Sequence, residues 1–245
     1  MIVVHHLNNS RSQRILWMLE ELGLAYEIKP YRRKPSMQAP DELRAVHPLG
    51  KSPVITDDDK TIAESGAIIE YLAEAYGGGR LTPAAGTPEK LRYTYFMHYA
   101  EGSLMPLLFM KLVFGRLPTR VPFFMRPVAR AISSGADKTL LNPQIGNHFF
   151  FLESELARRD WFAGDAFTAA DIQMSFPLEA ASARSPVIKQ MPRINAWLDR
   201  IQARPAYKRA LEKGGAYELM KQRRRQRTVL GPTQHSERTF QGAKR

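Results

Sequence analysis

The sequence predicts a small α/β domain followed by an all-helical domain, and three observations support this prediction. Strand-like and helix-like patterns alternate through the first 76 residues, a glycine- and proline-rich stretch occupies residues 77–88, and the later segments repeat their apolar residues at the helical period. Such an alternation is typical of a mixed sheet with helices on its faces. We therefore place the domains at residues 1–78 and 89–217, with residues 79–88 as the linker.

The first domain is predicted to have the order βαβα followed by ββα. Residues 2–7 (IVVHHL) and 25–31 form its first two strands, and the helix between them stops at Gly23. The remaining elements are a short helix in PDELRAVHP, a hairpin of residues 54–56 and 61–63 around a turn at 57–60, and a helix in SGAIIEYLAEAYGGG.

Helical periodicity marks the second domain, and in FTAADI the spacing of Thr168 and Asp171 predicts a capping box. Two apolar runs, SLMPLLFMKLVF and FFMRPVARAI, are too short to span a bilayer and are interrupted by basic residues, so we expect buried helix or the lining of a cleft. The predicted helices lie near residues 89–115, 122–132, 137–158, 169–183, 190–203 and 205–213.

Composition limits the chemistry and the setting of the protein. The chain contains no cysteine, which excludes disulfides, thiolate metal ligands and cysteine nucleophiles. The start MIVVHHLNNS lacks a basic segment followed by a long apolar one, so we expect no export signal and a cytoplasmic protein. His5 and His6 have no further ligand at metal-binding spacing, and residues 57–59 suit a turn, so we expect no metal site.

The formal net charge of +12 is unevenly distributed. Residues 221–245 contain eight basic residues and one acidic residue, so they supply more than half of the net positive charge. Because that stretch also has few apolar residues, the sequence predicts a basic, disordered tail at residues 218–245. A solvated tail is the favoured interpretation, and contact with nucleic acid or an anionic membrane is the alternative.

The motif HPLGKSPVI, residues 47–55, places a proline at the mouth of a predicted strand. Proline is tolerated where its missing N–H has no ladder partner, and a cis peptide bond there would turn the backbone of Ser52 toward open space, where an extended peptide can dock. Further along, Glu64 and Ser65 stand at the start of a helix, whose first amides bind a carboxylate well. The two motifs together predict a ligand with a peptide backbone and a carboxylate.

These pieces resemble the cytosolic-type glutathione S-transferase family. SRSQRILWMLEELG, HPLGKSPVI, AESGAIIEYL and FTAADI occur in that family's order across residues 1–213. The resemblance implies a thioredoxin-like first domain, an all-helical second domain with an electrophile pocket, glutathione as co-substrate and a homodimer. The implied activity is conjugation of the glutathione thiolate to small hydrophobic electrophiles, or its use in peroxide reduction.

The resemblance also assigns individual residues to glutathione. It implies that Pro53 is a cis-proline and that the backbone of Ser52 pairs with the cysteinyl part of the tripeptide. Glu64 and Ser65 match the pair that holds the γ-glutamyl end, and Lys51 is placed to meet the glycyl carboxylate as a point charge. Many family members have an apolar residue where Ser52 stands, but a contact made by the backbone tolerates this departure.

The catalytic position falls in NNSRSQR, where the family places a tyrosine, serine or cysteine. Ser10 lies four residues before Arg14, which resembles the serine-type spacing, so we predict that its hydroxyl and the start of the first helix stabilise the thiolate. Ser12 or a backbone amide is one alternative, and a site without an essential hydroxyl is another. Either serine could also cap the first helix.

Met105, Phe109 and Phe114 are the candidate lining of the electrophile pocket, although a stripe of this kind at helical spacing is also typical of a core. Two other functions stay open on the sequence. One is a transferase-like binding module without turnover. The other is a protein associated with nucleic acid or membrane that acts through the basic tail.

Overall fold

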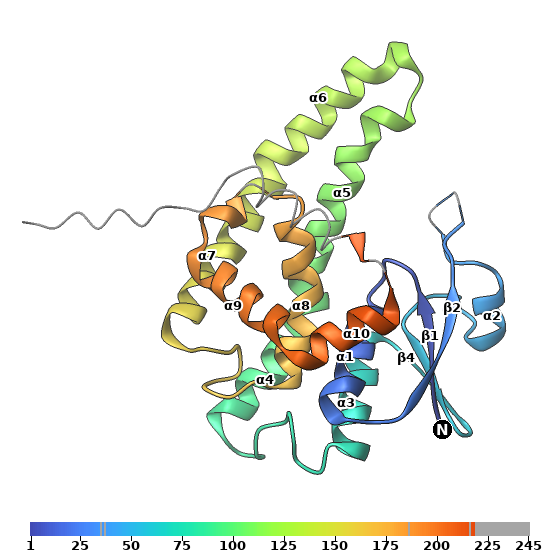
Figure 1. Cartoon of the computed structure of the whole chain (residues 1–245). Coiled ribbons are helices and arrows are strands. Elements are labelled where there is room, and N and C mark those ends of the chain that lie inside the picture. Colours follow the sequence, from blue (N-terminus) through green and yellow to red (C-terminus); the bar gives the residue numbers. More distant parts are fainter. Residues whose placement is uncertain (35, 37, 186, 216, 219–245) are drawn as a thin grey trace, which may run out of the picture.

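The computed structural model describes residues 1–34, 36, 38–185, 187–215 and 217–218, so the predicted tail lies outside the described residues apart from Glu218. Figure 1 shows a sheet with its covering helices at the start of the chain, packed beside a larger helical part. The predicted order of an α/β part and then an all-helical part is confirmed.

The sheet has four strands in the order β2-β1-β3-β4. β1 (Ile2–Leu7) and β2 (Tyr26–Tyr31) run parallel and are connected through α1 (Ser12–Leu22). β1 also pairs antiparallel with β3 (Val54–Asp57), which forms a hairpin with β4 (Lys60–Ala63). The turn of this hairpin is narrower than the prediction, because the residues at both its ends join the ladder.

Two further helices complete the α/β part. The short α2 (Glu42–Val46) precedes β3, and α3 (Ser65–Tyr76) follows β4 directly. Gly23 ends α1 in the left-handed conformation with a φ of 69°, as the sequence predicts.

The boundaries of several helices in the helical part differ from the prediction. The helix expected to end at residue 115 continues to Arg120, and Ser133 of its antiparallel neighbour donates to the Phe114 carbonyl oxygen over 2.8 Å. The helices are α4 (Pro88–Tyr99), α5 (Met105–Arg120), α6 (Arg126–Ala136), α7 (Asn142–Arg158), α8 (Ala169–Ser182), α9 (Pro192–Ala203) and α10 (Pro205–Gly214). Segments of π-helix at Ala100–Leu104 and Asp137–Leu141 and of 3-10 helix at Phe123–Met125 and Val187–Gln190 lie between them.

Helix α1 joins the two parts into one core. Ten of its 11 residues are buried, because the sheet covers one side and the helices α8 and α10 cover the other. Trp17 packs on the rings of Phe167 and Tyr207, with ring centroids 5.6 and 5.1 Å apart. Arg204 adds a two-pronged ion pair to Glu21, with N···O distances of 2.6 and 2.8 Å. These contacts fix the loop between β1 and α1, which carries the candidate catalytic serine.

The predicted capping box forms at the start of α8. The Thr168 N–H donates to the Asp171 carboxylate over 3.0 Å, and the same carboxylate accepts the Phe162 N–H and the Trp197 indole N–H over 3.1 and 3.0 Å. Burial raises the pKa of Asp171 to about 6, although these donors oppose the shift. The box thus holds α8, α9 and the loop before α8 together.

Candidate active site

A cleft of about 230 Å³ forms where the loop after β1, the stretch before β3 and the junction of β4 with α3 meet. The structure brings all five predicted binding residues into its wall, which are Lys51, Ser52, Pro53, Glu64 and Ser65. The rest of the lining comprises Arg11, His47, Leu49, Ala63 and Glu101. The two binding motifs of the sequence therefore belong to one site.

The peptide bond between Ser52 and Pro53 is cis, as the resemblance implies. β3 begins one residue later, at Val54, and its pairing with β1 starts at Ile55. The proline therefore lies before the ladder that would have needed its missing N–H. Ser52 is held at the cleft by its hydroxyl, which donates to the His5 carbonyl oxygen over 3.2 Å.

The turn from β4 into α3 forms the second wall of the cleft. Glu64 adopts a φ of 74°, which is uncommon outside glycine, and its carbonyl oxygen accepts the Ile68 N–H over 2.9 Å. Glu64 is thus the exposed N-cap, and Ser65 is the buried first residue of the helix. The first N–H groups of a helix lack partners within it and form the positive end of its dipole, so this wall suits a carboxylate.

A buried chain of hydrogen bonds leads from β1 to the cleft. His6 Nε2 lies 3.0 Å from the Gly214 carbonyl oxygen, and His6 Nδ1 lies 2.9 Å from Ser12 Oγ. Ser12 Oγ lies 2.7 Å from Ser10 Oγ, which in turn lies 3.4 Å from Ser52 Oγ. Because Ser52 lines the cleft, this row of polar side chains ends at the cleft wall, with the Ser10–Ser52 contact as its longest step.

The direction of these hydrogen bonds follows from the acceptor at the buried end. The Gly214 carbonyl oxygen accepts, so Nε2 of His6 carries a hydrogen. Burial lowers the pKa of His6, against a smaller opposite effect of the bond to Gly214, so the ring is neutral at pH 7. Ser12 Oγ lies 2.9 Å from His6 Nδ1 and 3.3 Å from the Leu7 carbonyl oxygen, so its hydrogen goes to the nearer Nδ1. Ser12 then accepts from Ser10.

This direction sets what the predicted catalytic serine can do. Ser10 and Ser12 are both buried, but Ser12 lies behind Ser10, one step further from the cleft wall. Ser10 Oγ also accepts the Ser12 N–H over 3.2 Å. Its own hydrogen points toward Ser12, and the Ser52 hydrogen points toward the His5 carbonyl oxygen, so no hydrogen lies between Ser10 and Ser52 in this arrangement. The Ser10 hydroxyl has to rotate before it can donate toward Ser52 and the cleft.

Two arginines on the turn into α1 share one carboxylate from the helical part. Arg11 Nε donates to both oxygens of Glu101 over 3.0 and 3.1 Å, and the buried Arg14 pairs with the same carboxylate. Burial favours protonation of Glu101, but the charges of Arg14 and Arg11 outweigh it and hold the pKa of Glu101 below its ordinary value of 4.5. Because two guanidinium groups share one carboxylate, this cluster carries a net positive charge beside the cleft.

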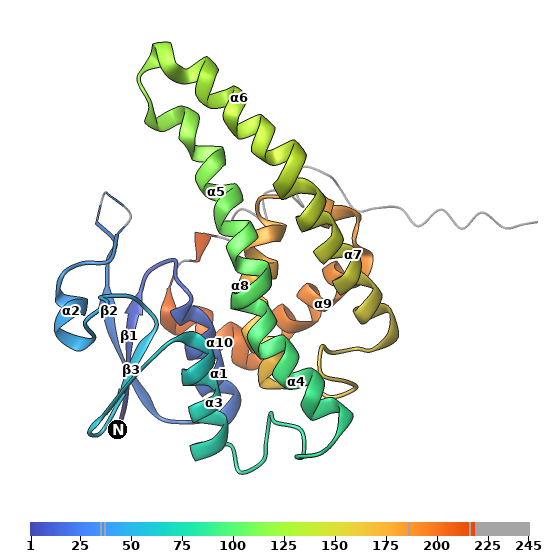
Figure 2. The same cartoon turned by 180° about the vertical axis from the view of Figure 1, so that it is seen from behind.

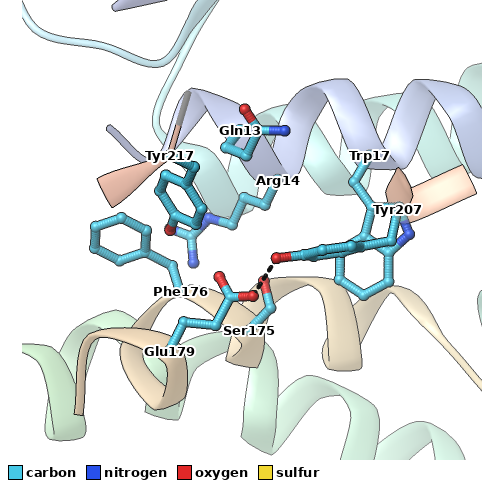
Figure 3. A pocket seen from close by; sticks show the side chains of 8 residues that line it. All are labelled: Gln13, Arg14, Trp17, Ser175, Phe176, Glu179, Tyr207 and Tyr217. Atoms are coloured by element: carbon cyan, nitrogen blue, oxygen red, sulfur yellow. Dashed lines mark hydrogen bonds between the residues drawn. The ribbon is translucent and has the colours of Figure 1, made fainter. Parts of the chain in front are cut away.

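Arg14 also borders an internal cavity of about 10 Å³, which is the size of one water molecule. Figure 3 shows Arg14 reaching from α1 toward Phe176 of α8, with Tyr217 beside it. On the same helix Glu179 accepts a hydrogen bond from the Tyr207 hydroxyl. The end of the described chain is therefore packed against the root of the loop that holds Ser10.

The three candidate pocket residues lie apart from the lining of the cleft. Met105 is buried in the core, and Phe114 is partly buried against it. Phe109 is 59% exposed on α5. Their assignment to an electrophile pocket stays a prediction.

Several cleft residues were missed by sequence reasoning. His47 and Leu49 stand inside the HPLGKSPVI motif, and Ala63 stands directly before Glu64, so the motifs themselves could have indicated them. Glu101 gave no such signal, because it comes from the helical part, 90 residues after Arg11.

The sheet order, the cis-proline before β3 and the helical part packed on α1 define a thioredoxin-like fold with an all-helical C-terminal domain. Family models match both parts: the glutathione S-transferase N-terminal domain matches residues 1–74, and the glutathione S-transferase C-terminal domain matches residues 117–205.

Curated relatives and solved structures agree with these matches. Glutathione S-transferase 3 of Schizosaccharomyces pombe is 39% identical over 213 residues, which cover 87% of this chain and 88% of that protein. Glutathione S-transferase 1 of Saccharomyces cerevisiae is 33% identical over 224 residues, which cover 88% and 96%. The crystal structure of a glutathione S-transferase from Actinobacillus pleuropneumoniae is 34% identical, with a TM-score of 0.75 and coverage of 90% and 96%.

A sphingomonad glutathione S-transferase, solved in complex with glutathione, shares the fold at 24% identity and a TM-score of 0.65, with coverage of 87% of this chain and 98% of that one. The chain belongs to the glutathione S-transferase family.

Proposed function

We propose that this protein is a glutathione transferase that binds glutathione in the cleft, stabilises its thiolate and presents it to a small hydrophobic electrophile. The observation that carries the proposal is the meeting in one cleft of the cis-proline segment and the start of α3. Membership of the family, and relatives that are named glutathione S-transferases, support the same function.

The proposed binding mode uses both walls of the cleft. The backbone of Ser52, which lies outside the strand ladder, pairs with the cysteinyl part of glutathione. Ser65 and the first amides of α3 hold the γ-glutamyl carboxylate, and Glu64 faces the γ-glutamyl amine. The exposed Lys51 pairs with the glycyl carboxylate.

The proposed chemistry needs a hydroxyl donor at the sulfur. Ser10 is the proposed donor, because its Oγ is nearer than Ser12 Oγ to the cleft wall at Ser52. When the thiol loses its proton to water, the negative sulfur attracts the Ser10 hydrogen away from Ser12, since hydrogen bonds to charged acceptors are the stronger ones. Ser12 can then turn its own hydrogen from His6 to Ser10.

The thiolate then attacks the electrophile. With chlorodinitrobenzene, a sulfur–carbon bond forms at the ring carbon and chloride leaves. Peroxide reduction is a second proposed use of the same thiolate, in which two glutathione molecules become one disulfide while the peroxide becomes an alcohol and water. We also propose that the protein is cytoplasmic and that it forms a homodimer.

A titration and an activity assay test this function. We expect calorimetry to show glutathione binding at micromolar to millimolar affinity, a rise in the thermal midpoint at saturating glutathione, and conjugation of chlorodinitrobenzene. Absence of both heat and midpoint shift at several millimolar glutathione would reject the proposed function. Binding without conjugation would instead indicate a glutathione-binding module.

A further inference from the structure

Helices α5 and α6 form a hairpin that extends beyond the rest of the helical part (Figures 1 and 2). The two helices run side by side, and the chain turns between them at residues 121–125. We call residues 116–130 the hairpin tip. Its position at the end of a projecting hairpin makes it accessible to a large partner.

The hairpin tip exposes a cluster of large apolar side chains. Phe123 is 78% exposed, Phe124 is 65% exposed, and Met125 and Val128 are 42% and 52% exposed. The two phenylalanine rings meet edge to face, with centroids 5.7 Å apart. Apolar surface of this kind gains free energy when it leaves water, so a cluster at an accessible point indicates an interaction site.

The same segment is strongly basic. The chain has no aspartate or glutamate from residue 102 to residue 136, and the hairpin tip has a formal charge of +4. Its charges are the exposed side chains of Arg116, Arg120, Arg126 and Arg130. The apolar apex is therefore surrounded by cations that no neighbouring acidic residue in the sequence neutralises.

This combination favours one kind of partner. An anionic bilayer surface can bind both the apolar side chains and the arginines of the hairpin tip. Aromatic and aliphatic side chains enter the boundary between headgroups and acyl chains, while arginines stay at the lipid phosphates. A second copy seated on the same patch would bring eight arginines together. Single-stranded nucleic acid could stack on Phe123 and Phe124, but it offers no comparable cover to Met125 and Val128.

The protein would bind at the surface of the bilayer and would not span it with the described helices. In the described part of the chain, each helix is too short or too polar to cross a bilayer. The apolar apex is instead a few residues long, which suits shallow insertion at the level of the headgroups.

We propose that the hairpin tip is an interfacial anchor that docks the protein on anionic phospholipid bilayers. Phe123, Phe124 and Met125 insert beside the headgroups, and the four arginines contact lipid phosphates. This surface is distinct from the proposed glutathione cleft, whose lining it does not share.

Vesicle flotation of the full chain tests the anchor. We expect binding to vesicles of phosphatidylcholine with 30% phosphatidylglycerol, and at least tenfold weaker binding to phosphatidylcholine alone. The double variant Phe123→Ser, Phe124→Ser should bind the anionic vesicles at least tenfold more weakly, and so should Arg120→Gln, Arg126→Gln. All four positions are exposed, so circular dichroism should show unchanged folding.

Matched variants elsewhere show whether the position matters. Phe150→Ser removes a phenylalanine that is 65% exposed on α7, and Arg158→Gln with Arg193→Gln removes two exposed charges away from the hairpin tip. Both controls should bind vesicles as the wild type does. If the controls weaken binding as much as the tip variants, the anchor is wrong and a general charge or apolar effect accounts for the binding.

A tryptophan at the apex shows whether the hairpin tip or residues 219–245 contact the vesicle. With Phe123→Trp we expect a blue shift of the emission on anionic vesicles and quenching by brominated lipid. Vesicle binding without either signal would overturn the proposal and assign the contact to another part of the chain. A response to a single-stranded oligonucleotide but not to vesicles, or a tip variant that changes the sedimentation coefficient, would overturn it in favour of nucleic acid or a second copy.

Discussion

At the scale of single residues, Ser10 has one hydroxyl hydrogen and two competing acceptors for it. In the structure it donates to Ser12, whose own hydrogen goes to the neutral His6. A thiolate at the cleft wall competes with Ser12 for this hydrogen, and its charge makes it the stronger acceptor. The proposed reaction therefore depends on a rotation of the Ser10 hydroxyl, which its hydrogen-bonded neighbours allow.

Replacement of Ser10 tests this role. In Ser10→Ala we expect nearly unchanged glutathione affinity, a rise of roughly one to two units in the pKa of the bound thiol, and a loss of about ten- to a hundredfold in turnover near neutral pH. Much of the loss should be recovered at high pH. Ultraviolet titration of the bound thiolate measures the shift.

Ser12→Ala is the matched control for the direction of the chain. It removes the acceptor of the Ser10 hydrogen, so the thiol pKa should stay at or below the wild-type value. Equal thiol pKa values in wild type and Ser10→Ala would sink the Ser10 assignment. A rise in Ser12→Ala alone would transfer the role to that residue.

Replacement of Ser65, at the start of α3, should affect glutathione affinity and not the thiol pKa. Ser65→Ala should weaken glutathione binding about tenfold and leave the pKa of the bound thiol unchanged, because its proposed role is to hold a carboxylate. Calorimetry gives the dissociation constant, and Thr61→Ala, on the exposed edge strand β4, serves as the control. An unchanged dissociation constant in Ser65→Ala contradicts the assignment.

At the scale of elements, α1 is connected to the helical part through charges as well as apolar packing. Arg14 extends from the first turn of α1 to Glu101 in the segment between α4 and α5, and to the Gln173 carbonyl oxygen of α8 over 2.6 Å. A guanidinium buried this deeply needs its counterion, since an unpaired buried charge is strongly destabilising.

Glu101→Gln should therefore lower the free energy of unfolding by about 2–3 kcal/mol at pH 7. The pKa of Glu101 is below 4.5 in the folded protein, so the ionised carboxylate stabilises the fold fully above pH 4.5, and this contribution is lost as the pH falls through the folded value. Urea unfolding at pH 7, 5 and 4 should show the gap to wild type narrowing at the lowest pH.

An exposed carboxylate provides the comparison for this pair. Glu27→Gln on β2 should change the free energy of unfolding by about 0.5 kcal/mol or less. If Glu101→Gln behaves like Glu27→Gln, the pair with Arg14 has little energetic importance in the fold.

At the scale of the whole molecule, the end of the described chain packs over the loop between β1 and α1 that carries Ser10, the proposed catalytic residue. Gly214 approaches α1 so closely that an added Cβ atom would lie 2.5 Å from Gln13 Oε1. Beyond it, Tyr217 is buried, and the Glu218 N–H donates to Asn9 Oδ1 over 2.8 Å. Residues from the first and last segments of the described chain thus form one structural unit around Ser10.

Two truncations test this closure. A chain that ends after Glu218 should keep its thermal midpoint and its glutathione chemistry, because residues 221–245 are highly basic and poor in apolar side chains. A chain that ends after Lys213 should lose roughly 5–10 °C in thermal midpoint, since it lacks the buried Tyr217 and the carbonyl that His6 contacts. Unfolding of the longer chain, or an unchanged midpoint of the shorter one, would refute the closure.

The sequence by itself determined the features that depend on local chemistry. Proline before a strand, a serine at a helix start, a glycine after a helix and the Thr168–Asp171 box act through neighbours in the chain, so their patterns can be read directly. That is why the sheet and the lining motifs of the cleft were predictable from local patterns, while the cis state of Pro53 was expected from the family resemblance. The narrower hairpin turn and the extension of α5 to Arg120 depended on pairing with adjacent elements.

Tertiary structure alone decided which distant groups meet. Glu101 reaches Arg11 across 90 residues and the Gly214 carbonyl reaches His6 across 208, and no local period encodes such contacts. The apolar face of α1 was visible in the sequence, but its burial on the other side as well was not, because the second cover comes from α8 and α10. Packing between elements remote in sequence therefore set the direction of the hydrogen bonds at Ser10, which no residue pattern specifies.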